Sequence, residues 1–231
     1  MDVFTYIARY PLASSAVFFV LLPLCLAWLR FAHAKGAFRL LFVFLLLDLA
    51  VGLWMMYLAA HRTNNILLLN LFVPFRYALF SGMFYYNFRS VAVRRVILYS
   101  IVAFGPMALL DIYASNHNLS DLHNHLVGRY SQVVESVLII LWVLLYFYEI
   151  IKTLAINNIL GYPFFWVCAG LLIFYSGNIF YFPFWYYTNT WENKLQLGFI
   201  DDIPFIVEII SLSLFAIGIW LTRSHHDTLH A

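Results

Sequence analysis

The chain has 231 residues, of which 64% are hydrophobic and 20% aromatic, while only 10% carry a charge. Soluble domains average about 25% charged residues, so this composition excludes a water-soluble domain, a disordered chain, collagen and a disulfide scaffold. A formal net charge of +2 is too small to indicate a nucleic-acid partner. We therefore expect a multi-pass integral protein of the cell (inner) membrane, with the lipid bilayer as its surroundings.

Seven stretches are long and apolar enough to cross a bilayer, whose ~30 Å core needs about 20 apolar residues per helix. None shows the alternating pattern of a lipid-facing barrel strand. Together they take up nearly the whole chain, so residues 1–231 are predicted to form a single all-α domain, one bundle of seven transmembrane helices. In chain order the predicted spans are residues 11–29, 37–60, 66–88, 91–112, 127–151, 163–187 and 203–222.

The distribution of Lys and Arg predicts the orientation of the bundle, because cytoplasmic loops carry an excess of these residues. Apart from Arg76, which lies within the membrane, one side has four such residues, namely Arg9, Arg62, Arg129 and Lys194. The other side has eight, namely Arg30, Lys35, Arg39, Arg89, Arg94, Arg95, Lys152 and Arg223. The N-terminus is therefore expected outside and the C-terminus in the cytoplasm.

The second and third spans each contain a charge at membrane depth, Asp48 and Arg76. Both lie about 20 Å from the turn expected near Arg62 and Thr63, at 1.5 Å per residue, so they share one depth. Burying either charge alone costs at least ~2.5–3.5 kcal/mol on insertion scales. We expect a buried structural ion pair between Asp48 and Arg76. The alternative is a two-state latch or a proton-coupled pair.

Several other polar residues fall in the predicted outward half of their spans. Ser131, Gln132 and Glu135 share one helix face by their three- and four-residue spacing, and three further candidates stand on other spans. The set predicts a water-accessible cavity open to the outside, in which carboxylates could bind a cationic or hydroxyl-bearing ligand or hold protons. Alternatively, each side chain only hydrogen-bonds a neighbouring helix. The candidate pocket residues are Asn70, Ser131, Gln132, Glu135, Asn178 and Glu208.

Two cofactor possibilities follow from the remaining residues. The longest outer loop carries His117, Asp121, His123 and His125, which are zinc-ligand types, but their spacing matches no established motif, so we expect a solvated loop without metal. A covalent retinal needs a lysine in the last helix, and the seventh span has none. No cofactor is expected.

Three aromatic-rich segments carry a resemblance. Residues 70–86 include Phe75-Arg76-Tyr77, residues 163–180 include Phe174-Tyr175-Ser176-Gly177-Asn178, and residues 215–221 complete the set. Together they resemble the seven-helix membrane modules of bacterial sensor proteins, some of which precede a cytoplasmic histidine kinase. The resemblance implies an outside-facing sensor module that signals through its cytoplasmic C-terminus. Only eight residues follow Arg223, so we expect the output to pass through a separate cytoplasmic signalling protein.

Two functions are compatible with these features. The first is a receptor-like or sensor membrane protein without catalysis of its own, which binds an unknown small ligand in the outer cavity. The alternative is an intramembrane lipid-modifying enzyme or a small proton-coupled transporter that uses Glu135 and Glu208 as acid, base or proton carriers.

Overall fold

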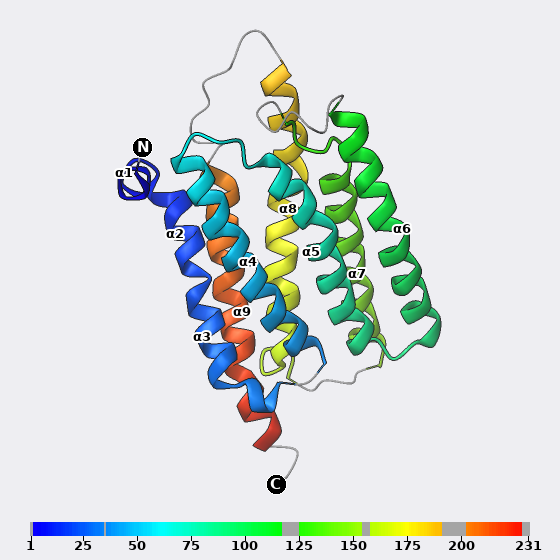
Figure 1. Cartoon of the computed structure of the whole chain (residues 1–231). Helices are drawn as coiled ribbons and strands as arrows, with labels where there is room; N and C mark the ends of the chain where they lie inside the picture. Colours follow the sequence, from blue (N-terminus) through cyan, green and yellow to red (C-terminus); the bar gives the residue numbers. More distant parts are fainter. Residues whose placement is uncertain (1, 35, 117–124, 154–157, 191–201, 228–231) are drawn as a thin grey trace.

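The computed structural model describes residues 2–34, 36–116, 125–153, 158–190 and 202–227 (Figure 1). All the secondary structure assigned to these residues is helical. A short 3-10 helix covers Phe31–His33. The α-helices are α1 (Val3–Arg9), α2 (Pro11–Phe19), α3 (Leu21–Leu29), α4 (Ala37–Ala60), α5 (Ile66–Asn87), α6 (Val91–Ser115), α7 (Ser131–Thr153), α8 (Pro163–Thr190) and α9 (Ile203–Asp227).

Within the described ranges, seven helical segments are long and apolar enough to span a membrane, as the sequence predicts. Helices α2 and α3 together form the first of them, over Pro11–Leu29. Most boundaries agree with the predicted ones, but α7 begins at Ser131 rather than at residue 127. The reason lies on α6, where the Asp111 carboxylate accepts the backbone N–H groups of Tyr130 and Ser131 at 3.0 and 2.7 Å. A carboxylate at this position stabilises the otherwise unpaired N–H groups of a helix start.

The first span is interrupted at Val20, between α2 and α3. Pro23 follows three residues later, and a proline lacks the N–H that would bond the carbonyl four residues earlier, here that of Phe19. Its ring also crowds that carbonyl. The interruption is therefore a proline effect within one continuous apolar segment.

The turn between α4 and α5 forms where it is predicted. Arg62 adopts a left-handed backbone with φ of 56°. Its N–H bonds the carbonyl of Ala59 at 3.0 Å, and the N–H of Thr63 bonds that of Leu58 at 2.9 Å. This pair of bonds is the Schellman arrangement that satisfies the last carbonyls of a helix.

The helices pack as one bundle, with the N-terminus and the α4–α5 turn at one end and the C-terminus at the other (Figure 1). We call these the N-terminal end and the C-terminal end. Helix α9 packs against α8, α3 and α2, while α5 packs against α4, α6 and α7. Helix α6 lies at the edge of the bundle and presents large apolar side chains outward, such as Val102 at 72% exposure. An apolar outer face of this kind suits contact with lipid.

Near the C-terminal end, interlocked aromatic rings hold α5, α7 and α8 together. The ring centroids of Tyr146 and Phe164 lie 5.2 Å apart, and those of Phe84 and Phe164 lie 5.6 Å apart, both edge to face. Lipid is as apolar as these rings, so close packing rather than the hydrophobic effect drives helix association in a bilayer. Edge-to-face pairs of this kind contribute about 0.5–1.5 kcal/mol each beyond their buried area.

Candidate functional site: a polar cavity inside the bundle

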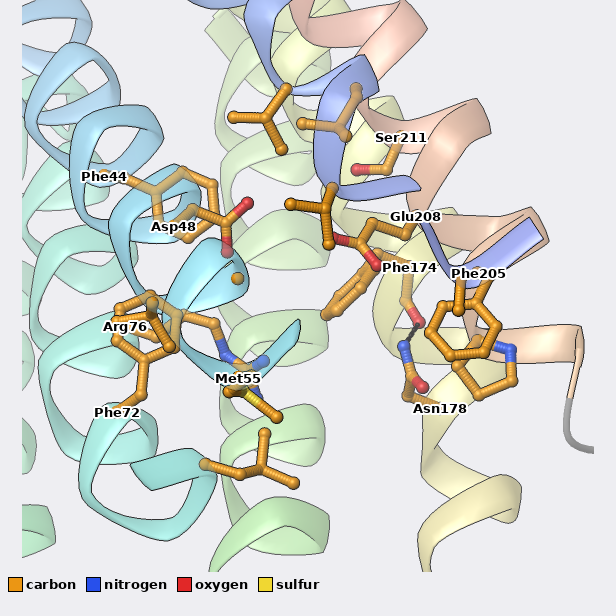
Figure 2. Close-up of a pocket in the computed structure, with 18 of the residues that line it drawn as sticks. Phe44, Asp48, Met55, Phe72, Arg76, Phe174, Asn178, Phe205, Glu208 and Ser211 are labelled. Atoms are coloured by element: carbon orange, nitrogen blue, oxygen red, sulfur yellow. Dashed lines mark hydrogen bonds between the residues drawn. The ribbon is translucent and has the colours of Figure 1, made fainter. Parts of the chain in front are cut away.

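A cavity of about 340 Å³ lies between α2, α4, α5, α8 and α9 (Figure 2). On α4 its wall runs from Met56, near the N-terminal end of the bundle, to Phe44. This stretch corresponds to about 18 Å at 1.5 Å per residue, more than half the thickness of a hydrocarbon core. The cavity therefore reaches from the N-terminal end to the middle of the predicted membrane. Its volume is within the range of cavities that hold small organic ligands.

Two carboxylates face each other across this cavity. Asp48 comes from α4 and Glu208 from α9, and both are half-buried. Figure 2 shows their carboxylate groups turned towards the space between the two helices. Among the described residues, neither makes a hydrogen bond or an ion pair within 4 Å. Both groups are therefore open to whatever occupies the cavity.

Hydroxyl and amide groups complete the polar part of the wall. Asn178 donates its amide N–H to the carbonyl of Phe174 at 2.9 Å, which leaves the amide oxygen as an acceptor. Ser211 lies one turn after Glu208 on α9. Ser14 on α2 is 2% exposed, and its hydroxyl has no hydrogen-bond partner in the described part of the chain. A buried hydroxyl without a partner is costly, and a ligand in the cavity would remove this cost.

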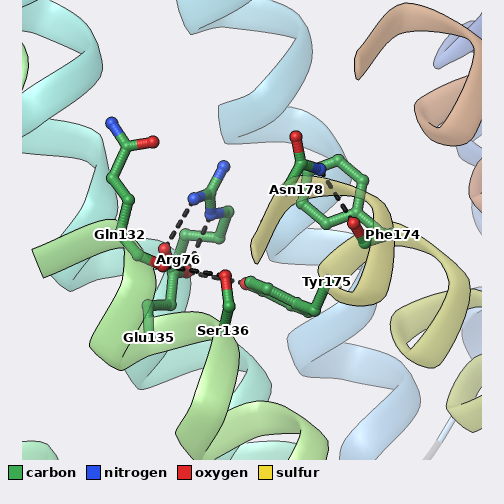
Figure 3. A network of polar contacts seen from close by, with 7 residues as sticks. All are labelled: Arg76, Gln132, Glu135, Ser136, Phe174, Tyr175 and Asn178. Atoms are coloured by element: carbon green, nitrogen blue, oxygen red, sulfur yellow. Dashed lines mark hydrogen bonds and ion pairs between the residues drawn. The ribbon is translucent and has the colours of Figure 1, made fainter. Parts of the chain in front are cut away.

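Arg76 on α5 lines the cavity as well, but its ion pair is with Glu135 rather than with Asp48 as the sequence predicts. Its Nε and Nη2 donate to the two carboxylate oxygens of Glu135 on α7, at 2.8 and 2.6 Å (Figure 3). Residue counting from the α4–α5 turn relates only these two neighbouring helices. In the bundle, α7 also packs against α5 and brings Glu135 to the same arginine. A two-pronged arrangement matches the planar guanidinium to a carboxylate and is the strongest geometry for such a pair.

Two aromatic residues of α8 join this ion pair. The Tyr175 hydroxyl donates to Glu135 Oε1 at 2.7 Å, and the Phe174 ring centroid lies 5.6 Å from Arg76 Cζ. Phe174 also lines the cavity. Because Arg76 and Phe174 both line the cavity, the ion pair is part of the structure that supports the cavity wall.

The candidate residues from the sequence divide into two groups. Asn178 and Glu208 line the cavity, together with Asp48 and Arg76. Asn70, Ser131, Gln132 and Glu135 do not.

Asn70 has a structural role at the N-terminal end of the bundle. Its amide donates to the carbonyl of Leu126 at 2.9 Å and accepts the N–H of Gly128 at 3.0 Å. Ser131 stands directly beyond, at the start of α7, with its N–H bonded to Asp111. Asn70 thus fixes the bundle by hydrogen bonds, as in the alternative to a ligand pocket that the sequence left open. Asp111 was missed because it lies near the end of its span, where a charge needs no special explanation.

Gln132 differs from Asn70 in its hydrogen bonding. It is 1% exposed, and neither its amide nitrogen nor its amide oxygen has a hydrogen-bond partner in the regions the structure describes. It precedes Glu135 by one turn on α7, as Figure 3 shows. Its backbone carbonyl accepts the Ser136 hydroxyl at 2.8 Å.

The zinc-type residues His117, Asp121 and His123 lie outside the described residues. His125 is described and buried. Within the described ranges, no group of three or more His, Cys, Asp or Glu side chains stands close enough to hold a metal ion.

The described part of the chain thus forms an all-helical bundle of seven candidate membrane spans, with an internal cavity whose largely apolar wall carries a few polar groups. No family model matches the sequence, and no match was found among curated proteins or solved structures.

Proposed function

We propose that the chain is a receptor-like or sensor membrane protein that binds a small ligand in the cavity between α2, α4, α5, α8 and α9. The observation that carries this proposal is the cavity itself, whose unpaired carboxylates stand in a wall of aromatic and aliphatic side chains. A concave, mostly apolar site with a few converging polar groups is the usual form of a small-molecule site.

Helix α9 supports a sensing role because it connects the cavity to the C-terminal end. It carries Glu208 and Ser211 in the cavity wall and then runs on to Asp227. Near that end, the Arg30 guanidinium stacks on the Trp220 ring, with Cζ 4.4 Å from the centroid, and donates to the Trp220 carbonyl. A ligand that binds two arrangements of α9 unequally would shift their populations, and a separate cytoplasmic signalling protein would read the change. The resemblance to bacterial sensor modules favours the same kind of output.

We also propose that the N-terminal end faces the outside of the cell membrane and the C-terminal end the cytoplasm. By the sequence, eight Lys and Arg residues belong to the C-terminal side and four to the N-terminal side, which is the asymmetry of a cytoplasmic C-terminus. The ligand would then enter from outside.

Cysteine accessibility tests this orientation and the water access of the cavity together. Phe205→Cys, on the cavity wall, should react in intact cells with a small membrane-impermeant methanethiosulfonate. The background is Cys25→Ala, because Cys25 is exposed whereas Cys168 is buried. The matched control is Val102→Cys on the outer face of α6, which should stay unmodified because lipid covers it. Reaction only in inverted vesicles would overturn the orientation, and no reaction from either side would overturn the open cavity.

The second candidate function is an intramembrane lipid-modifying enzyme or a proton-coupled transporter. The facing carboxylates Asp48 and Glu208 favour it, since paired carboxyl groups serve as acid and base or carry protons. Glu135, which the sequence suggested for this chemistry, is held by Arg76 and Tyr175 instead.

Analysis of small molecules retained by the purified protein distinguishes the two functions. We expect a ligand to be extracted from the wild-type protein, to be depleted from Ser211→Phe or Ala13→Phe, which fill the cavity, and to be retained by Val102→Phe. A thermal melt of each variant shows that it is folded. If incubation returns the ligand unchanged, binding is supported. Conversion to a product would favour the enzyme, and equal retention by all the folded variants would contradict a ligand in the cavity.

A further inference from the structure

We infer that the cavity selects ligands with a protonated amine attached to an apolar body, so that an ammonium group binds between Asp48 and Glu208. This inference rests on the proposed function and specifies the chemical class of its ligand.

The charges of the described residues around the cavity favour a cation. Asp48 and Glu208 have no partner within 4 Å, while the one guanidinium in the wall, Arg76, is engaged through two nitrogens by Glu135. Asp48, Glu208 and Glu135 are thus three carboxylates around one cation, Arg76. An anionic ligand would add to an excess of negative charge in a medium that screens it poorly, whereas an ammonium group would neutralise part of it.

Hydrogen-bond acceptors in the cavity wall match an ammonium donor. An ammonium group has three N–H donors and no acceptor. Ser14, whose buried hydroxyl has no partner in the described ranges, lines the same cavity. The Asn178 amide oxygen remains an acceptor, because Asn178 bonds to Phe174 through its N–H. Ser14 is an observation independent of the carboxylates, because its buried hydroxyl has no hydrogen-bond partner in the described ranges and an ammonium donor that reached it would supply one.

The rest of the wall suits an apolar body. Aromatic rings from four helices surround the carboxylates (Figure 2), and aromatic faces attract cations as well as apolar groups. These rings are Phe44, Phe72, Phe80, Phe174, Phe205 and Phe215. A strongly hydrated inorganic ion would gain nothing from such a wall, so an organic amine is the better match.

Three probes with one shape and different head groups test the inference: 4-phenylbutylamine, 4-phenylbutanol and 4-phenylbutanoate. Binding of each to the full chain in lipid nanodiscs is measured by calorimetry at neutral pH. We expect the amine to bind at least tenfold more tightly than the alcohol and the carboxylate to bind most weakly. Asp48→Asn combined with Glu208→Gln should abolish this preference, and Ser14→Ala should weaken amine binding several-fold.

Glu149→Gln provides the matched control. Glu149 is a carboxylate outside the cavity that accepts the backbone N–H of Arg89, so its loss should leave the amine preference intact. If the alcohol binds as tightly as the amine, the cavity binds ligands but the inference is wrong, because the carboxylates are then protonated and neutral. If none of the probes binds to folded wild-type protein while another extracted ligand does, the inference fails and the proposed function stands. If nothing binds, both fail.

Discussion

Glu135→Leu is expected to lower the free energy of unfolding by about 3–5 kcal/mol, the usual cost of removing one partner from a buried ion pair. Glu135 is completely buried and holds Arg76 through both carboxylate oxygens. An arginine cannot shed its charge in a protein. The substitution would therefore leave a permanent cation at membrane depth, and Asp48, which lines the same cavity as Arg76, could compensate it only in part.

Arg76→Leu should cost less, about 1–3 kcal/mol, because the carboxylate left behind can take up a proton and still bond to the Tyr175 hydroxyl. The double variant Arg76→Leu/Glu135→Leu should recover most of the loss, since a buried pair is often replaceable by apolar side chains of similar size. Unfolding in increasing SDS, followed by circular dichroism, measures all three. If Arg76→Leu proves more damaging than Glu135→Leu, then Asp48 already neutralises Arg76 and the pairing described above is incomplete.

The seven spans could be predicted because each is fixed by a one-dimensional property, the length of an apolar run. The position at which a helix is interrupted inside a span also depends on a nearby residue, as the interruption before Pro23 shows. The start of α7 was misplaced because it depends on Asp111, twenty residues earlier on another helix. Local signals therefore predict which residues are helical better than they predict where a helix begins when a distant side chain caps it.

The cavity could be predicted only in part, for a geometric reason. Depth along a helix follows from residue counting, but the direction in which a side chain points depends on which helices are neighbours. Asn178 and Glu208 have both the predicted depth and the direction required, and they line the cavity. Glu135 has the depth, yet α7 turns it towards α5 and α8, where Arg76 and Tyr175 bind it.

Arg76 connects the cavity to the interior of the bundle. One part of it lines the cavity, while its Nε and Nη2 hold Glu135 on α7. A cationic ligand between Asp48 and Glu208 would also repel this guanidinium and press it towards Glu135. If a ligand binds in the cavity as proposed, Arg76 would couple its binding to the packing of α5 against α7.

Gly218→Ala is expected to lower the free energy of unfolding by about 1–3 kcal/mol, the cost of overpacking a close-packed site. A Cβ at this position of α9 would lie 2.8 Å from the backbone carbonyl oxygen of Pro163 on α8 and 3.2 Å from Val167 Cγ2. The carbonyl cannot rotate away as a side chain would, so the two helices must separate. Small residues at helix crossings permit the close approach on which association in lipid depends.

Gly105→Ala is the matched control for this effect. Gly105 lies within α6, and a Cβ there would meet nothing within 4 Å, so the substitution should be neutral or stabilise the helix by up to about 1 kcal/mol through helix propensity. SDS unfolding of both variants separates packing from propensity, because the chemical change is the same. Equal stability of Gly218→Ala and wild-type protein would show that α8 and α9 do not approach as closely as Pro163 and Gly218 indicate.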